Sequence, residues 1–441
     1  MSERSGVRTS RLIGAAGLGV VVSGVVVNVY LAVVARALSP AEYVSFGAFW
    51  SLGLVVGFGP FLPIEQELAR RLQAAPDRRA QLGAAAVAAA GGVLLALAAL
   101  AVVSPLVLRS LGHEAGAFAA LAVLCAVSGA QFLLRGTLIG GNRLVRHGAV
   151  MVLDASLRLA LAVGLFLFGG QDATAFCWAL VAAIALAHVP LLPGALRRAV
   201  AHDPVGFLGD PPGGPLEGPA ARRGALLDRT ACRSFAAAAL PLLAGSVCAQ
   251  LLLNGLPVLV AALATPADQA AAGVFVAAFT LARAPLSIVV PLQSAVVPTL
   301  TRLLAEGRRA QVRSLLVRGA GALVALAAVG MPAAALVGPA VVRLVFGARY
   351  DIAGLDLALI IGGVLAHIGL VVMTQVHVAR AAHRAVAMSW VAALLAAGIT
   401  FVAVGNLLRA AELAFGVGSA AGALAAVGLL FVHHPREVRH V

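Results

Sequence analysis

Several ionisable side chains lie inside long apolar stretches of this chain, where they could bind a charged partner. The most isolated is Arg283, whose stretch also holds three prolines, Pro285, Pro291 and Pro298. Its planar guanidinium can bind pairs of oxygen atoms on an anion. Each proline removes a backbone donor and can bend or open a helix. Arg283 is therefore a candidate anion-binding residue; the alternative is an interfacial or carbonyl-paired arginine.

Two further sets of charges are spaced for pairing along a helix. Asp154 and Arg158 are four residues apart, so on a helix they share a face and can form an intrahelical ion pair. If the pair lines a cavity, it could instead bind a polar headgroup or exchange a coupled proton. Glu65 and Glu67 end an apolar stretch, and Arg71 is placed to pair with Glu67. These three residues predict either an interfacial cluster at a helix end or a gate on the cytoplasmic side.

The apolar stretches also contain amide and histidine side chains. Asn28 and Asn254 could line a cavity or form hydrogen bonds between helices. His367 and His377 are ten residues apart, too far for one helical face to offer a two-histidine metal site. The sequence also has no P-loop phosphate-binding motif. We therefore expect no metal, no cofactor and no ATPase site.

Membrane-spanning helices must position these side chains. Hydrophobic residues make up 61% of the 441 positions and charged residues 11%, and the mean hydropathy is +1.00. The apolar residues form runs of about 20, which match the roughly 30 Å hydrocarbon core of a bilayer at 1.5 Å rise per residue. Strands of a membrane barrel would alternate polar and apolar residues, and the run 93–103 does not. An all-α membrane protein is predicted, and not a soluble enzyme.

Twelve membrane-spanning helices are expected, with both termini in the cytoplasm. Their approximate ranges are 12–35, 43–63, 82–106, 117–134, 148–169, 174–195, 235–263, 269–298, 319–340, 354–378, 386–405 and 411–432. Most of the 32 basic residues, all of them arginine, then fall in cytoplasmic segments, as the positive-inside rule requires. The net charge of +14 is explained by attraction to anionic lipid, so we expect no nucleic-acid partner.

A segment rich in proline and glycine divides the chain into two halves of six helices. The expected parts are an N-terminal lobe at 1–200, a cytoplasmic linker at 201–233, a C-terminal lobe at 234–432 and a cytoplasmic tail at 433–441. At an offset of 226 residues the halves align without gaps, and the superposed pairs include Asn28 and Asn254, Pro40 and Pro266, and Gly47 and Gly273. Repeats with an even number of helices share one orientation, which predicts a cavity between two lobes that move against each other.

Several segments resemble a known family. NVYLAVVARALSPAEYVSFG at 28–47, with EQELAR at 65–70, resembles the opening of polysaccharide flippases of the multidrug/oligosaccharidyl-lipid/polysaccharide exporter superfamily. RGTLIGGNRLVRHG at 135–148 resembles the turn after the fourth helix of that family, and LVFGARYDIAG at 344–354 resembles its element before the tenth. The major facilitator superfamily is disfavoured, because the loop after the second helix lacks the glycines of that superfamily's signature.

The resemblance implies a flippase in the bacterial cytoplasmic membrane. Such proteins move polyprenyl-pyrophosphate-linked oligosaccharides, the precursors of cell-surface polysaccharide, between leaflets by alternating access. Arg283, the pair Asp154 and Arg158, and the asparagines Asn28 and Asn254 would then contact the headgroup. The resemblance also implies contact with membrane lipid and, as protein partners, a polysaccharide polymerase or glycosyltransferases. Two alternatives stay open: an ion-coupled drug or metabolite exporter of the same superfamily, and a non-transporting membrane scaffold of envelope synthesis.

Overall fold

Long helices make up most of the chain that the structure describes. The structure is a computed structural model, and it describes residues 2–74, 77–169, 172–201, 228–286, 300–380 and 382–432. The helices of the first half are α1 Ser2–Ala37, α2 Pro40–Ala74, α3 Arg78–Val102, α4 Ser104–Ser110, α5 Ala115–Gly140, α6 Leu144–Phe168, α7 Ala173–His188, the 3₁₀ helix η1 Val189–Leu191 and α8 Leu192–Ala201. Those of the second half are α9 Arg229–Leu263, α10 Gln269–Ala282, α12 Arg309–Phe346, α13 Gly354–Ala379, α14 His383–Ala403 and α15 Leu407–Val432.

Eleven helical segments of the described residues are long and apolar enough to cross a membrane. The expected span 269–298 begins with α10, an apolar helix of 14 residues, and positions 287–299 lie outside the described residues. The chain is thus a multi-pass, helical membrane protein, as its composition predicts. The number of twelve helices and the cytoplasmic side of the termini stay predictions.

Short polar side chains and one glycine set several helix boundaries. The Asp77 carboxylate accepts a hydrogen bond from the Ala80 backbone N–H at 3.0 Å, at the start of α3. Asp172 and Asp228 cap α7 and α9 in the same way, which satisfies backbone donors that have no partner within the helix. α6 ends where Gly169 adopts a φ of 85°, a conformation open to glycine without steric cost.

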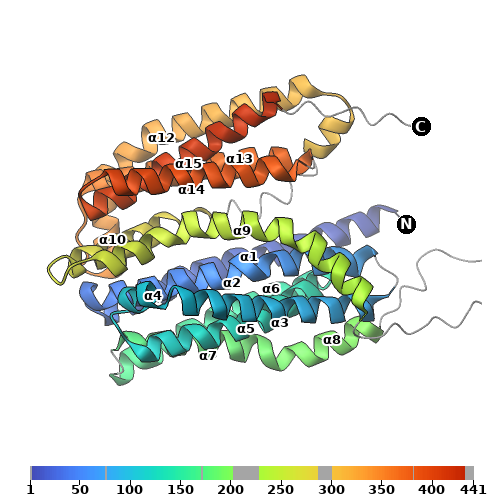
Figure 1. Ribbon diagram of the computed structural model, residues 1–441, viewed down its shortest axis with the longest axis horizontal. Helices are drawn as coiled ribbons and strands as arrows, with labels where there is room; N and C mark the ends of the chain where they lie inside the picture. Colours follow the sequence, from blue (N-terminus) through green and yellow to red (C-terminus); the bar gives the residue numbers. More distant parts are fainter. Residues whose placement is uncertain are drawn as a thin grey trace, which may run out of the picture.

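The helices form two lobes (Figure 1). α1–α8 make up the N-terminal lobe, α12–α15 make up the C-terminal lobe, and α9 and α10 lie between them. α1 begins and α15 ends at the same end of the bundle, which we call the terminal end (Figure 1). Positions 202–227 and 433–441, which hold most of the predicted linker and the predicted tail, lie outside the described residues. α9 begins at Arg229, inside the range that the sequence assigns to the linker.

One large buried cluster contains side chains of both lobes. Its aromatic members include Tyr30, Tyr43, Phe46, Phe49, Phe275, Phe279, Phe346, Tyr350 and Phe415. A smaller cluster joins Phe61 and Phe132 of the N-terminal lobe to Phe235 near the start of α9. The two lobes are therefore connected through apolar contacts as well as through the chain, and α9 takes part in both clusters.

Candidate translocation site

The lobes meet at the end of the bundle opposite the termini, the closed end, where α2 packs against α10. A Cβ atom on Gly273 would stand 1.7 Å from the carbonyl oxygen of Pro40, and one on Gly47 would stand 2.3 Å from Cγ1 of Val276. Because glycine has no Cβ, it lets the helices approach this closely. Gly47 and Gly273 are one of the pairs that the repeat superposes, so corresponding positions of the two halves build this contact.

Hydrogen bonds and an aromatic pair seal the closed end. The rings of Tyr43 and Tyr350 pack edge to face with centroids 5.7 Å apart. The Tyr350 hydroxyl donates to the backbone oxygen of Leu38 at 3.3 Å, and Arg36 Nε donates to the backbone oxygen of Val345 at 3.0 Å. Burial raises the pKa of the Tyr350 hydroxyl well above its ordinary value, so this group stays a neutral donor. These contacts tie the end of α1 and the start of α2 to the end of α12 and the turn that follows it.

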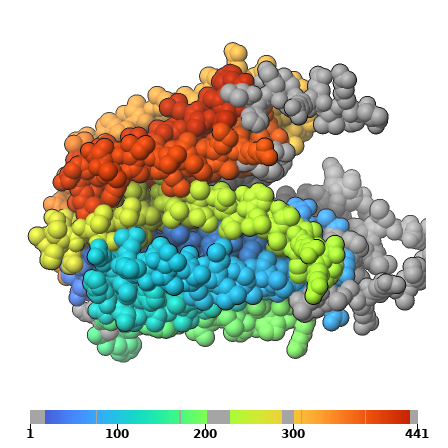
Figure 2. Space-filling view, in the orientation of Figure 1, coloured from blue at the N-terminus to red at the C-terminus, as the bar shows by residue number. Residues whose placement is uncertain are grey.

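Toward the terminal end the lobes diverge, and a gap opens between them (Figure 2). α9 stays on the N-terminal lobe there and bends toward it (Figure 1). It contains Pro241 and Pro257, and a proline inside a helix removes a hydrogen bond and produces a bend. α9 packs against α2 and α3 on one side and against α14 and α15 on the other. It is therefore the helix that connects the two lobes.

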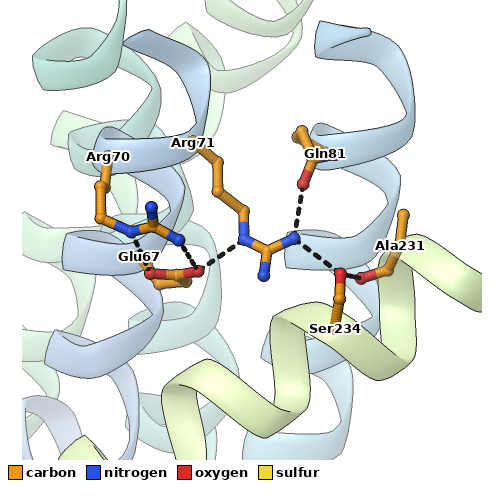
Figure 3. Close-up of polar contacts among 6 residues, drawn as sticks. All are labelled: Glu67, Arg70, Arg71, Gln81, Ala231 and Ser234. Carbon is orange, nitrogen blue, oxygen red and sulfur yellow. Dashed lines mark hydrogen bonds and ion pairs between the residues drawn. The ribbon is translucent and has the colours of Figure 1, made fainter. Parts of the chain in front are cut away.

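A polar cluster holds the start of α9 against α2 and α3 (Figure 3). Arg71 Nε lies 2.5 Å from Glu67 Oε1, the pair expected from their spacing. Arg71 Nη1 also donates to Gln81 Oε1 at 3.0 Å and to Ser234 Oγ at 2.9 Å. Arg70 binds the same Glu67 carboxylate at 2.7 Å, but its side chain is 63% exposed. Arg71 is thus the residue of this cluster that reaches α9.

Glu65, the third residue of the predicted gate, lies in the interior of the N-terminal lobe. Its Oε2 atom is 2.8 Å from Arg135 Nε, and the Arg135 guanidinium lies over the Phe132 ring at 4.7 Å. The sequence places Arg135 in a cytoplasmic segment, but α5 continues to Gly140 and buries this side chain. The residues that follow Arg135 are mostly apolar, and this pattern indicates that the helix continues past it. Structure therefore brings Glu67 and Arg71 together and keeps Glu65 apart from them.

The Asp154 and Arg158 side chains form the expected pair along α6. Arg158 Nε donates to Asp154 Oδ1 at 3.0 Å, and Nη2 donates to Oδ2. The guanidinium lies 5.8 Å from the Trp50 ring centroid, and Arg158 lines a cavity of about 40 Å³ with Ser128 and Gln131. A cavity of this size holds about one water molecule. This cavity is therefore too small for a headgroup.

Arg283 lies at the end of α10, next to α9. Its Nε donates to the Phe279 carbonyl at 3.3 Å, and its Nη1 donates to Asn254 Oδ1 at 2.8 Å and to the Leu253 carbonyl. Pro257 lacks the N–H that would bond to that Leu253 carbonyl within α9. None of the ion pairs among the described residues includes Arg283. It is a buried cation whose observed partners are uncharged.

A surface groove of about 700 Å³, the lateral groove, runs beside α1 between the lobes. It is lined by Val21, Gly24, Val25, Asn28, Val29, Ala32, Val33, Arg36, Leu281, Ala284, Pro285, Leu344 and Val345. Its walls are mostly apolar, and Val25 is 60% exposed, so the groove opens toward the lipid. Ala284 and Pro285 directly follow Arg283 in the chain. The groove thus reaches the end of α10 that carries Arg283, and Asn28, one of the predicted cavity residues, lies along it.

The two histidines of α13 have separate partners. His367 Nδ1 lies 3.3 Å from Ser419 Oγ, and His377 Nε2 lies 2.8 Å from the Ala426 carbonyl. Within the described ranges, no group of three or more histidine, cysteine or acidic side chains is arranged to hold a metal ion. Both histidines therefore join α13 to α15, a packing role that the sequence could not distinguish from a polar site.

No protein-family model matches this chain. It is 30% identical over 387 residues to the uncharacterized protein Rv3630 of Mycobacterium tuberculosis (strain ATCC 25618 / H37Rv), an alignment that covers 84% of this chain and 80% of that protein. It is 31% identical over 378 residues to the uncharacterized protein Rv1510 of the same strain, with 83% and 79% covered.

Solved structures share the fold. A multidrug resistance MATE family transporter of the MOP superfamily, in an inward-facing conformation, superposes with a TM-score of 0.63 at 14% identity, over 95% of this chain and 93% of that chain. A MOP superfamily transporter from Pyrococcus furiosus, described as having a binding pocket of reverse polarity, superposes with a TM-score of 0.57 at 15% identity, over 95% and 94%. The fold is that of MOP superfamily transporters, a broader group than the flippases that the sequence resembles.

Proposed function

We propose that this chain, which belongs to the same family as the mycobacterial proteins Rv3630 and Rv1510, is a transporter that moves a lipid-linked anion across the membrane by alternating access. The fold of MOP superfamily transporters supports the general activity. The substrate class is an oligosaccharide linked to polyprenyl pyrophosphate. The observation that carries this choice is the lateral groove at the end of α10, the end that also carries the uncompensated charge of Arg283.

The substrate needs an apolar path next to a cationic site. A polyprenyl chain can stay in contact with the bilayer while it lies along the lateral groove, whose walls are mostly apolar. The pyrophosphate can bind the guanidinium of Arg283, whose planar donors match pairs of phosphate oxygens. In the present conformation these donors bind groups of α9 and α10. The anion therefore binds when the movement of the lobes separates α9 from α10.

The orientation of this conformation follows from the predicted position of the termini. With both termini in the cytoplasm, the gap at the terminal end faces the cytoplasm, and the closed end faces outward (Figure 2). A substrate made in the cytoplasm would enter from that gap. The lateral groove, which reaches Arg36 near the closed end, then guides the lipid tail toward the outer leaflet.

A drug exporter of the same superfamily is the second candidate. The likeness to a multidrug resistance transporter favours it. A cationic drug would bind an accessible carboxylate inside the transporter, but Glu65 and Asp154 are paired with Arg135 and Arg158. This charge pattern favours an anionic substrate. A scaffold without transport activity, the third candidate, would not depend on Arg283.

The direct test uses the purified protein in liposomes that contain a fluorescent polyprenyl-pyrophosphate oligosaccharide. A membrane-impermeant quencher then reports the fraction of label in the outer leaflet over time. We expect Arg283→Gln to lower the initial rate at least tenfold, and Arg283→Lys to retain part of it because the charge remains while the planar geometry is lost. Arg79→Gln, which removes an exposed arginine of α3, is the matched control and should transport like the wild type.

The outcomes separate the candidates. Equal rates for wild type and Arg283→Gln would remove Arg283 from the mechanism. Wild-type liposomes that leave the lipid in place but take up a cationic dye would establish the drug exporter instead, and liposomes inactive toward both would favour the scaffold. Depletion of the protein in its host should also leave polyprenyl-linked oligosaccharide on the cytoplasmic leaflet, and an unchanged lipid distribution would contradict the proposed substrate.

A further inference from the structure

A second pocket, of about 410 Å³, lies on the N-terminal lobe near its terminal end, outside the lobe interface. Its lining residues come from the end of α5, the following turn, the start of α6, η1 and α8. α8 lies on the side of the N-terminal lobe that faces away from the C-terminal lobe (Figure 1). We call this pocket the basic pocket, after its three arginines, Arg143, Arg146 and Arg198.

The three arginines come from two places in the chain, the start of α6 and α8, and together they form the rim of the basic pocket. Arg143 ends the turn between α5 and α6, Arg146 is in the first turn of α6, and Arg198 is on α8. The turn is tight, because Asn142 adopts a φ of 53° and the Arg143 N–H donates to the Leu138 carbonyl at 2.8 Å. The turn thus fixes the backbone of Arg143 at the start of α6.

The floor of the basic pocket is apolar. Leu134, Leu138, Val150 and Ala195 form a buried cluster of their own and line the pocket. At its outer side, Leu153 is 42% exposed and Leu191 is 43% exposed. Both of these leucines also line the pocket. The surface therefore changes from charged to apolar within one cavity, which matches a molecule that has an anionic head and an apolar tail.

The charge at the rim is uncompensated. Among the described residues, no ion pair includes Arg143, Arg146 or Arg198. Burial, and then the nearby positive charges of Arg146, Arg198 and Arg78, lower the pKa of Arg143. Like charges held together by the backbone repel one another. An anion at the rim would convert this repulsion into attraction.

We infer that the basic pocket binds an anionic phospholipid from the leaflet at the terminal end. Its phosphate binds the arginines of the rim, and an acyl chain lies against Leu138 and Leu153. Basic pockets between membrane helices on the cytoplasmic side bind anionic headgroups, and arginine binds phosphate through paired hydrogen bonds. A free phosphate would contact the arginines but gain nothing from the apolar floor. This site is separate from the lateral groove, so it does not rest on the proposed transport function.

The test measures phospholipid adducts on the detergent-solubilised protein by native mass spectrometry. The probes are dioleoyl phosphatidylglycerol and, as a neutral reference, dioleoyl phosphatidylcholine. We expect preferential binding of phosphatidylglycerol by the wild type. The triple variant Arg143→Gln, Arg146→Gln, Arg198→Gln should bind it roughly 100-fold more weakly, because each basic residue near an anionic lipid contributes about fivefold. Arg79→Gln, Arg302→Gln, Arg318→Gln removes three exposed arginines elsewhere and should change binding by less than about threefold.

Three results would overturn the inference. The first is an equal loss of binding in the two triple variants, which would show general charge attraction. The second is displacement of the lipid by sn-glycerol 3-phosphate at equal affinity, which would show a site for a free phosphate. The third is loss of phosphatidylglycerol binding by a folded variant in which all three arginines are replaced by lysine. This Lys variant keeps the charge and should retain binding within about tenfold of the wild type. It also provides a test if the triple Gln variant fails to fold.

Discussion

Replacing Gly273 with alanine would test whether the close approach of α2 and α10 keeps one end of the protein closed. The added Cβ would stand 1.7 Å from the Pro40 carbonyl oxygen and 2.6 Å from the Pro40 carbonyl carbon. Close carbon–oxygen contacts between packed helices are about 3.3–3.6 Å. The obstacle is backbone, which cannot rotate away as the end of a side chain can. α10 must therefore move away from α2 by roughly 1.5–2 Å.

The substitution destabilises the conformation in which this end is closed. An extra methyl group in a well-packed contact costs about 1–3 kcal/mol. A conformation in which the lobes separate at this end is free of the clash. The ratio of closed to open molecules should then fall by about 5- to 150-fold. Even the lower limit of this range changes the population of closed molecules enough to be measured.

Spin labels across the closed end would measure that change by double electron–electron resonance. Val103 of the N-terminal lobe is 45% exposed and Leu355 of the C-terminal lobe is 61% exposed, so cysteines there can be labelled after the four native cysteines are replaced by alanine. Gly273→Ala should add a population at longer distance. Gly255→Ala on α9 is the matched control, because its new Cβ would have no atom within 4 Å.

An unchanged distance distribution in Gly273→Ala would show that the helix contact does not hold this end closed. A second variant covers the case in which Gly273→Ala does not fold. The atom nearest to the Cβ of Gly47→Ala would be a side-chain methyl of Val276, at 2.3 Å, and not a backbone atom. It should therefore give the same shift in a smaller fraction of molecules.

Two other predictions concern polar clusters. Arg71→Ala should loosen the start of α9, because it removes a charge-assisted hydrogen bond to Ser234 that contributes about 1.5–3 kcal/mol. Backbone hydrogen exchange in the first turns of α9 should then become faster. The control variant Arg70→Ala should leave that exchange unchanged. Glu65→Ala should destabilise the N-terminal lobe by about 3–5 kcal/mol, because it leaves the buried Arg135 without its partner. Thermal unfolding in detergent would measure this loss of stability. The double variant Glu65→Ala, Arg135→Leu should recover most of the lost stability.

The positions of the helices could be predicted because a bilayer requires apolar runs of a fixed minimum length. Their ends were harder to place. α2 continues to Ala74, past the predicted end at 63, although Pro60 and Pro63 lie inside it. Neighbouring membrane helices can accommodate such prolines. α9 begins at Arg229 because Asp228 caps it, and its polar first turns pack on the N-terminal lobe. No hydropathy pattern indicates that packing.

Local pairs of the site were predictable, and distant ones were not. The spacing of four residues places Arg71 beside Glu67 on any helix, and no other knowledge of the fold is needed. The Glu65–Arg135 pair joins positions 70 residues apart, and its geometry depends on how α2 packs against α5. The contact between Arg283 and Asn254 similarly depends on the fold, because α9 and α10 come together only in the folded protein.

Arg283 binds the Leu253 carbonyl, which Pro257 leaves without a partner within α9. This is the point at which α9 would bend in the proposed movement of the lobes. α9 is held to the N-terminal lobe by Ser234 and by Ser246, whose hydroxyl donates to the Phe58 carbonyl at 3.0 Å. Beyond Ser246, the helix has a missing hydrogen bond at Pro257, and the carbonyl that this leaves free binds Arg283. A pyrophosphate that attracts Arg283 would release this carbonyl and leave α9 weakest at that point.

Pro257→Ala should therefore oppose the movement. The alanine N–H can bond to the Leu253 carbonyl within α9, which strengthens the helix at the point where it must bend and removes one acceptor of Arg283. We expect a higher unfolding temperature and a lower transport rate from the same variant. A mutation that merely disturbs packing would lower both. Transport at the wild-type rate in a stabilised Pro257→Ala would place the bend elsewhere in α9, with Pro241, the other proline of this helix, as the next position to test.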